Sequence, residues 1–179
     1  RNLGAMLMRQ GEGDGDPFTN FGVARYSENL GKNSRIGGVL TSKISPTNQQ
    51  TTSSIDGFVR FNDVLSFSGM VSTTQESQTG QTGLAEYAQF YYKGNFTTAY
   101  WTHTVVTDQY KPAMGFVSRS NIMSNSQGFE FNIRKPWMPS MIRFWAPGIY
   151  TEFYHSLKTG NLVERRIMGS PMWLGLQNG

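Results

Sequence analysis

Residues 129–134 have the sequence Phe129-Glu130-Phe131-Asn132-Ile133-Arg134, in which apolar and polar side chains alternate without a break. Successive side chains of a β-strand point to opposite faces, whereas a helix repeats its face every three or four residues. We therefore predict a strand with one apolar face and one polar face, Glu130 lying on the polar one. In a membrane barrel the apolar face would contact lipid and the polar face would line the lumen.

The same period of two recurs along almost the whole chain. Residues 55–62 and 65–72 show it clearly, the latter with a polar face made mostly of serine. Apolar residues do not recur at helical spacing over any sustained stretch. We predict ten strands, at residues 3–10, 18–29, 34–44, 55–62, 64–74, 83–93, 95–107, 121–135, 140–156 and 161–177.

Several of these predicted strands reach ten residues or more. Soluble strands average about five to six residues, and a tilted strand that crosses a membrane needs about nine to eleven. Strand length therefore favours the fold class of an all-β, antiparallel, up-and-down transmembrane β-barrel over an ordinary soluble sheet.

The links between the predicted strands alternate between short and long. Outer-membrane barrels have short periplasmic turns and longer outside loops. We expect the short turns to share one side of the membrane and the long links the other. The link at 157–160 is short where a long one is due. The short turns are at 31–33, 62–63, 94–95 and 136–139, and the long links are at 11–17, 45–54, 75–82 and 108–120.

Aromatic side chains concentrate towards the ends of predicted strands or midway along the longest ones. Examples are Tyr91, Tyr92, Trp101, Trp145 and Trp173. Girdles of Trp and Tyr at the two membrane interfaces have this distribution. The alternative is that aromatic residues simply favour strands.

Composition excludes several classes of function. The chain has 179 residues, which suits a single domain, and it has no cysteine, so disulfides and cysteine-based zinc sites are excluded. The net charge of +4 comes from 16 basic and 12 acidic residues without a basic run, so we expect no nucleic-acid partner. No window is long and apolar enough for a transmembrane helix.

Three motifs carry a resemblance to a known family. Residues 18–42 look like "N-x-x-V-A-R … S-x-I-G-x-x-x-T", and residues 110–119 look like "F-x-P-x-x-G-F-V-x-R" with Tyr110 in place of the first Phe. With residues 157–162, their order resembles a family of uncharacterised Gram-negative outer-membrane proteins. Those proteins carry an N-terminal domain similar to family-9 carbohydrate-binding modules, followed by a large β-barrel. The resemblance covers roughly Asn2 to Gly179 as the barrel part only.

This resemblance implies a place in the cell outer membrane and a transport, channel or membrane-anchoring role. It implies contact with membrane lipid and lipopolysaccharide, and with other outer-membrane proteins or the rest of the same barrel. Any glycan handling would belong to the carbohydrate-binding-like domain, which has no counterpart in these 179 residues. The alternative class is a soluble all-β ligand-binding barrel or sandwich, with apolar residues inside and polar residues outside. The alternation of apolar and polar residues is the same in a membrane barrel and in a soluble barrel or sandwich, so it does not by itself distinguish these two classes.

Charged residues on the predicted polar faces are the candidate lumen-lining residues. In a barrel such charges can select solutes. They can equally pair with one another across neighbouring strands, which requires no ligand. The candidates are Arg60, Glu130, Arg134, Arg143 and Glu152.

The sequence offers little for metal binding or catalysis. Glu12, Asp14 and Asp16 alternate with glycine, and calcium prefers such oxygen ligands, but the spacing does not match an EF-hand, and a flexible polar loop explains it equally well. His103 and His155 have no Ser or Asp partner at a diagnostic spacing, and no G-x-S-x-G motif occurs. We expect no cofactor, no metal and no enzymatic activity.

The ten predicted strands are expected to be part of a larger barrel. An open sheet in lipid would leave two edges of unpaired backbone groups, each costing several kcal/mol. Missing strands or another chain would cover these edges. We therefore expect residues 3–10 and 161–177 not to form a ladder with each other.

Overall fold

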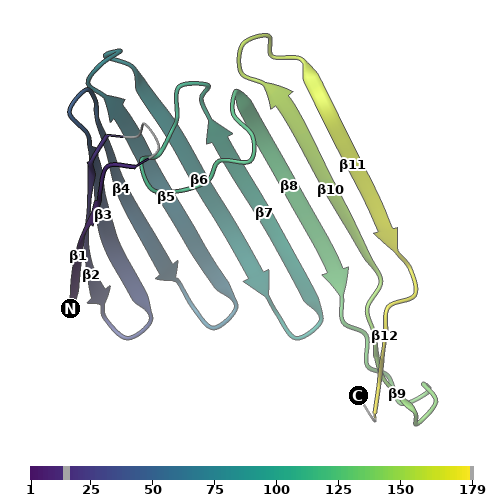
Figure 1. Cartoon of the computed structure of the whole chain (residues 1–179). Coiled ribbons are helices and arrows are strands. Elements are labelled where there is room, and N and C mark those ends of the chain that lie inside the picture. The colour runs from purple at the N-terminus through teal and green to yellow at the C-terminus, as the bar shows by residue number, and fades with distance from the viewer. Residues whose placement is uncertain (14–16, 178–179) are drawn as a thin grey trace.

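The computed structural model describes residues 1–13 and 17–177 (Figure 1). Within these ranges every regular element is a β-strand, and ten of the twelve strands form one antiparallel sheet. The predicted all-β, antiparallel fold is confirmed. No helix in the described ranges could span a membrane.

The large sheet follows the order of the chain, and β9, which lies between β8 and β10 in sequence, is the strand that this order skips. Its order is β1-β2-β3-β4-β5-β6-β7-β8-β10-β11, and β9 and β12 form a separate two-stranded ribbon. The strands are β1 (Asn2–Gln10), β2 (Thr19–Leu30), β3 (Ser34–Ile44), β4 (Gln49–Arg60), β5 (Leu65–Glu76), β6 (Thr82–Lys93), β7 (Thr97–Val106), β8 (Ile122–Phe131), β9 (Ile142–Trp145), β10 (Gly148–Ser156), β11 (Leu162–Ser170) and β12 (Leu174–Leu176).

Two predicted strands are each divided in the structure. The predicted strand 140–156 is interrupted at Pro147 into β9 and β10, and 161–177 is interrupted at Pro171 into β11 and β12. Proline has no backbone N–H to give to a ladder, so the large sheet is bounded at both positions: β10 begins just after Pro147, and β11 ends just before Pro171. The predicted strand 121–135 is also too long, because β8 ends at Phe131.

The predicted start of β4 was wrong by six residues. β4 begins at Gln49, so the link predicted at 45–54 contains only residues 45–48. Residues 49–54 are all Gln, Thr or Ser, so both faces of this half-strand are polar and no alternation of hydrophobicity reveals it. Its ladders are regular on both sides, with Thr52 opposite both Thr41 and Thr74.

The register gives the sheet two different faces. Residues directly opposite one another in the ladder lie on the same face. The polar face contains Arg25, Thr41, Thr52, Ser54, Asp56, Ser72, Thr74, Tyr87, Thr102, Thr104, Ser124, Ser126, Glu152 and Tyr154. The apolar face contains Leu3, Leu7, Leu40, Ile55, Phe67, Val71, Phe90, Trp101, Phe129, Phe131, Ile149 and Ile167.

β8 shows how the two faces are kept apart. The rings of Phe129 and Phe131 meet edge to face at 4.9 Å on the apolar face. Glu130 lies between them in sequence and on the opposite face, where it accepts a hydrogen bond of 2.8 Å from the Tyr150 hydroxyl. The apolar face is left bare: Ile55 is 65% exposed and Leu7 is 88% exposed.

The sheet is not closed. Among the described residues β1 pairs with β2 alone and β11 with β10 alone, which confirms the expectation that 3–10 and 161–177 form no ladder. Figure 1 shows the turns after β2, β4 and β6 together at one end of the sheet, and the links after β3, β5, β7 and β10 at the other.

Candidate functional site: a hollow on the polar face

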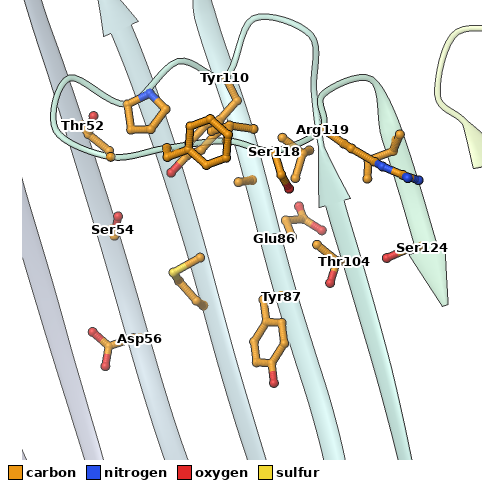
Figure 2. Close-up of a pocket in the computed structure, with 18 of the residues that line it drawn as sticks. Thr52, Ser54, Asp56, Glu86, Tyr87, Thr104, Tyr110, Ser118, Arg119 and Ser124 are labelled. Atoms are coloured by element: carbon orange, nitrogen blue, oxygen red, sulfur yellow. The ribbon is translucent and has the colours of Figure 1, made fainter. Parts of the chain in front are cut away.

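A hollow of about 920 Å³ lies on the polar face (Figure 2). It is lined by side chains from β2 through β8, by β10 and by the link between β7 and β8. One hollow can touch strands so far apart only if the sheet curls around it, so the polar face is the concave one here.

The link of residues 107–121, here called the strap, lies across the polar face and covers part of it. Figure 2 shows it crossing the strands, with Thr52 beneath one side of it, Arg119 on the other side and Tyr110 between them. The Tyr110 hydroxyl is 2.8 Å from Ser72 Oγ, the Lys111 N–H donates to Thr74 Oγ1 at 3.3 Å, and the Ala113 N–H donates to Thr52 Oγ1 at 3.2 Å. The hydroxyl groups of β4 and β5 thus satisfy polar groups of the strap.

The strap sits in contact with the sheet because of one glycine. A Cβ on Gly83 in β6 would overlap the backbone of Gln109 and Tyr110. Any larger residue at position 83 would have to push the strap away from the sheet. The close approach leaves Ser72, which lies opposite the neighbouring Ala85, only 1% exposed.

Two ion pairs connect the ends of the strap to the β10–β11 hairpin. Lys158 Nζ is 2.6 Å from Asp108 Oδ2, and Arg119 is 2.6 Å from Glu164 Oε2. The hydrogen bond from Lys158 and its charge hold the pKa of Asp108 below its ordinary value. The hydrogen bond to Glu164 raises the pKa of Arg119. Both pairs are exposed to solvent, so each contributes little to stability by itself.

Side chains that line the hollow from the polar face are mostly neutral, and the charged ones are paired. Arg25 lies 3.0 Å from Asp56. Glu152 lies 3.4 Å from Arg166 and accepts a 2.6 Å hydrogen bond from the Tyr154 hydroxyl. Hydroxyl groups make up most of the remaining polar lining: Thr41, Thr52, Ser54, Thr102, Thr104, Ser118, Ser124 and Ser126.

Of the five predicted lumen-lining residues, only Glu152 lies in the hollow. Glu130 and Arg60 lie on the same face of the sheet but outside the hollow. Arg134 follows the end of β8 and donates to Asn132 Oδ1 at 3.3 Å, and Arg143 lies in the separate β9–β12 ribbon. The structure therefore does not bring the five together.

Several residues of the site were missed at the sequence level. The sequence predicts an outside loop at 108–120 and does not identify the Arg25–Asp56 pair or Arg119 as site residues. The available signal was the run of small and hydroxyl-bearing residues on β4, β5 and β6. This run indicates a binding surface for the strap only once the register is known, because the register places Thr52 opposite Thr74 and Thr74 opposite Gly83.

The weak candidates for metal binding and catalysis do not form a site in the described residues. Glu12 is exposed, and Asp14 and Asp16 lie outside the described residues. Within residues 1–13 and 17–177, no group of three His, Asp or Glu side chains could hold a metal ion. His103 contacts Asn125 Oδ1 at 2.9 Å on the face opposite the hollow, and register places His155 on that face too.

The fold and the site together define a class: an open, ten-stranded, up-and-down antiparallel sheet with a strapped hollow on its polar face. No protein-family model, no curated protein and no solved structure matches the chain. Its function is therefore inferred from its own geometry.

Proposed function

We propose that this chain is part of an outer-membrane β-barrel through which polar solutes pass. In this proposal the apolar face contacts lipid and lipopolysaccharide, the polar face lines the lumen, and the strap narrows it. One observation carries the proposal: the strap covers the polar face, while the apolar face, including Ile55 and Leu7, stays bare.

The bare apolar face supports a lipid environment. Soluble monomeric proteins rarely expose one continuous apolar patch larger than a few hundred Å². Here exposed apolar side chains occur from β1 to β11, and in the described residues the only buried apolar side chains are Ala85 and Ala146. Such a protein in water would lack a hydrophobic core, whereas a bilayer would cover the whole face.

Strand length supports the same environment. Seven consecutive strands, β2 to β8, contain 10 to 12 residues each. This length meets the requirement of about nine to eleven residues for a tilted membrane-crossing strand.

The strap favours solute passage over a purely anchoring role. An anchor needs only the lipid-facing side of a barrel, yet this sheet holds a 15-residue link across its polar face with several hydrogen bonds. A link folded against the lumen wall reduces the width of a pore and sets which solutes fit it.

The two unpaired edges imply that further strands complete the barrel. Unpaired N–H and C=O groups of β1 and β11 would each cost several kcal/mol in hydrocarbon. We infer that the rest of the same barrel, or another chain, pairs with them.

The soluble alternative predicts the reverse arrangement of faces. A soluble binding barrel encloses its apolar side chains and exposes the polar ones. In this structure the strap and the hollow are on the polar face, which favours the membrane proposal.

The proposal is tested on the full-length protein. We expect it to fractionate with outer membranes, to require detergent for extraction, and to give ion conductance in planar bilayers. A protein that remains in the aqueous fraction without detergent would contradict the membrane assignment. A membrane protein without conductance would contradict the passage of solutes and leave only an anchoring role.

A further inference from the structure

We propose that the hollow binds an uncharged polyhydroxylated solute, a sugar or a short oligosaccharide. This inference rests on the proposed passage of polar solutes and names their chemical class.

The charges of the hollow argue against an ionic solute. Four charged side chains line it, three from the polar face and Arg119 from the strap. Each has an opposite charge close by: Arg25 with Asp56, Arg119 with Glu164, and Glu152 with Arg166. Glu86 also borders the hollow, but its register with Val71 and Val105 places its side chain on the apolar face. An ionic solute would have to compete with an existing ion pair, whereas an uncharged one would not.

One hydroxyl group of the lining lacks a partner. Thr41 is 8% exposed, lines the hollow from β3, and its Oγ1 has no hydrogen-bond partner among the described residues. A buried polar group without a partner is costly, and Thr41 Oγ1 is shielded from solvent in this structure. A solute hydroxyl group that reaches it after a rotation of the Thr41 side chain would gain a donor and an acceptor there. Thr104 and Ser124, opposite each other on β7 and β8, provide hydroxyl groups on the far side of the hollow.

Aromatic and apolar surfaces complete the lining. Tyr87 borders the hollow from β6, and Phe116 borders it from the strap and is 91% exposed. Tyr154 borders it from β10, with the Arg119 guanidinium 4.9 Å from the centroid of its ring. An aromatic ring offers a flat apolar face with a polar edge. A sugar ring has apolar C–H faces and a rim of hydroxyl groups, so it matches this combination of rings and hydroxyl-bearing side chains.

The size of the hollow agrees with such a ligand. Its volume of about 920 Å³ is near the upper end of the roughly 300–1,000 Å³ that is usual for small-molecule sites. It is larger than one hexose requires and leaves room for a short oligosaccharide.

The test measures binding and conductance separately on the full-length protein in detergent and in planar bilayers. The probes are maltotriose, gluconate as an anion and glucosamine as a cation. We expect saturable binding of maltotriose by calorimetry and reversible block of the conductance, with the two charged probes at least tenfold weaker.

Two variants connect the binding to the hollow. Tyr87→Ala should weaken maltotriose binding at least tenfold. Thr41→Val, which replaces the unpartnered hydroxyl with a methyl group of similar size, should weaken it about fivefold and leave thermal stability unchanged or raised. The matched control is Ser66→Ala on the polar face outside the hollow, which should bind as the wild type does.

The outcomes separate this inference from the function on which it rests. Conductance without maltotriose binding, or tighter binding of gluconate or glucosamine, would overturn the solute class and leave solute passage standing. Maltotriose binding without conductance would support the site and overturn passage. Binding that survives Tyr87→Ala and Thr41→Val unchanged would place the ligand elsewhere and overturn the assignment to the hollow.

Discussion

Position 128 in β8 must be glycine because the ring of Tyr100, on the neighbouring strand, occupies the space of a side chain there. Gly128 and Tyr100 are partners in the β7–β8 ladder, and a Cβ on residue 128 would overlap the Tyr100 ring. The ring therefore lies over the glycine, in the space next to Tyr150, which is the partner of Gly128 on its other side. The glycine is needed here for its missing side chain, because its backbone has no positive φ.

We predict that Gly128→Ala lowers the free energy of unfolding by about 1–3 kcal/mol, the usual cost of forcing a side chain into filled space. The matched control is Gly57→Ala in β4, where a Cβ would meet its nearest atom at an ordinary 3.8 Å. Urea unfolding of the full-length protein in detergent, followed by tyrosine and tryptophan fluorescence, measures both. Equal stability of the two variants would show that the Tyr100 ring moves freely.

The sequence predicts some of these residue-level features and not others. The opposite faces of Phe129 and Glu130 follow from covalent geometry alone, because neighbouring strand residues must point apart. The Tyr100–Gly128 contact depends on the register between two strands separated by the strap. A single sequence does not determine that register.

At the scale of elements, the strap depends on Gly83 for its close contact with the sheet. We predict that Gly83→Val displaces the strap and exposes it to proteases, because any Cβ there meets the backbone of Gln109 and Tyr110. Trypsin cleavage after Arg119 should become at least severalfold faster. Gly169→Val is the control, because a Cβ there has no neighbour within 4 Å. An unchanged cleavage rate in Gly83→Val would mean that the strap is not held against β6.

The Asp108–Lys158 pair makes one end of the strap sensitive to acid. The pKa of Asp108 is lowered in the folded chain, so its contribution is present above the ordinary value of 3.8 and is lost as pH falls through the lower, folded pKa. We predict that a spin label at Gln109→Cys, an exposed position next to Asp108, gains mobility only below about pH 4. In Asp108→Asn the label should be more mobile already at pH 7. A label whose mobility at pH 7 is the same with and without Asp108→Asn would contradict this anchor.

The long link after β7 was predictable, but its course over the sheet was not. Its length and polarity indicate a loop, whereas its fold onto the polar face depends on hydroxyl groups from β4 and β5 and on Gly83 from β6. These elements come together only in the assembled sheet. The first half of β4 escaped prediction for a related reason, since its neighbours in the ladder, and not its own hydrophobicity, make it a strand.

At the scale of the whole molecule, the membrane proposal predicts a large difference between two neighbouring positions on one face. Ile55→Arg should destabilise the protein by about 2–4 kcal/mol if residue 55 lies near the bilayer midplane. Ser53→Arg, two residues along β4 on the same face, lies in the polar half of the strand opposite Leu40 and Thr73, nearer the strand end, and should cost less, about 1 kcal/mol. Unfolding in lipid vesicles measures both. Because Ile55 is 65% exposed, a soluble protein would tolerate Ile55→Arg as easily as Ser53→Arg.

The two ends of the sheet should lie on opposite sides of the membrane. The chain has no native cysteine, so a single introduced cysteine gives an unambiguous label. We expect a membrane-impermeant maleimide added to whole cells to label Gln78→Cys, in the link after β5, and not Asn95→Cys, in the turn after β6. Labelling of both from outside would contradict the assignment of the sides.

The all-β, up-and-down organisation was predictable because period two and alternating link lengths are local properties. The curl of the sheet around a hollow and the division of strands at Pro147 and Pro171 were not predicted. The curl depends on the twist accumulated over ten strands.

The two unpaired edge strands, β1 and β11, allow copies of the isolated chain to pair with one another. The sheet contains an even number of strands in up-and-down order, so β1 and β11 run in opposite directions (Figure 1). The β11 edge of one copy can therefore meet the β1 edge of the next copy as an ordinary antiparallel pair. Such a head-to-tail contact either closes into a ring or continues into a filament. With both edges unpaired, the isolated chain is thus a monomer capable of polymerising, and its concentration would determine when ribbons form.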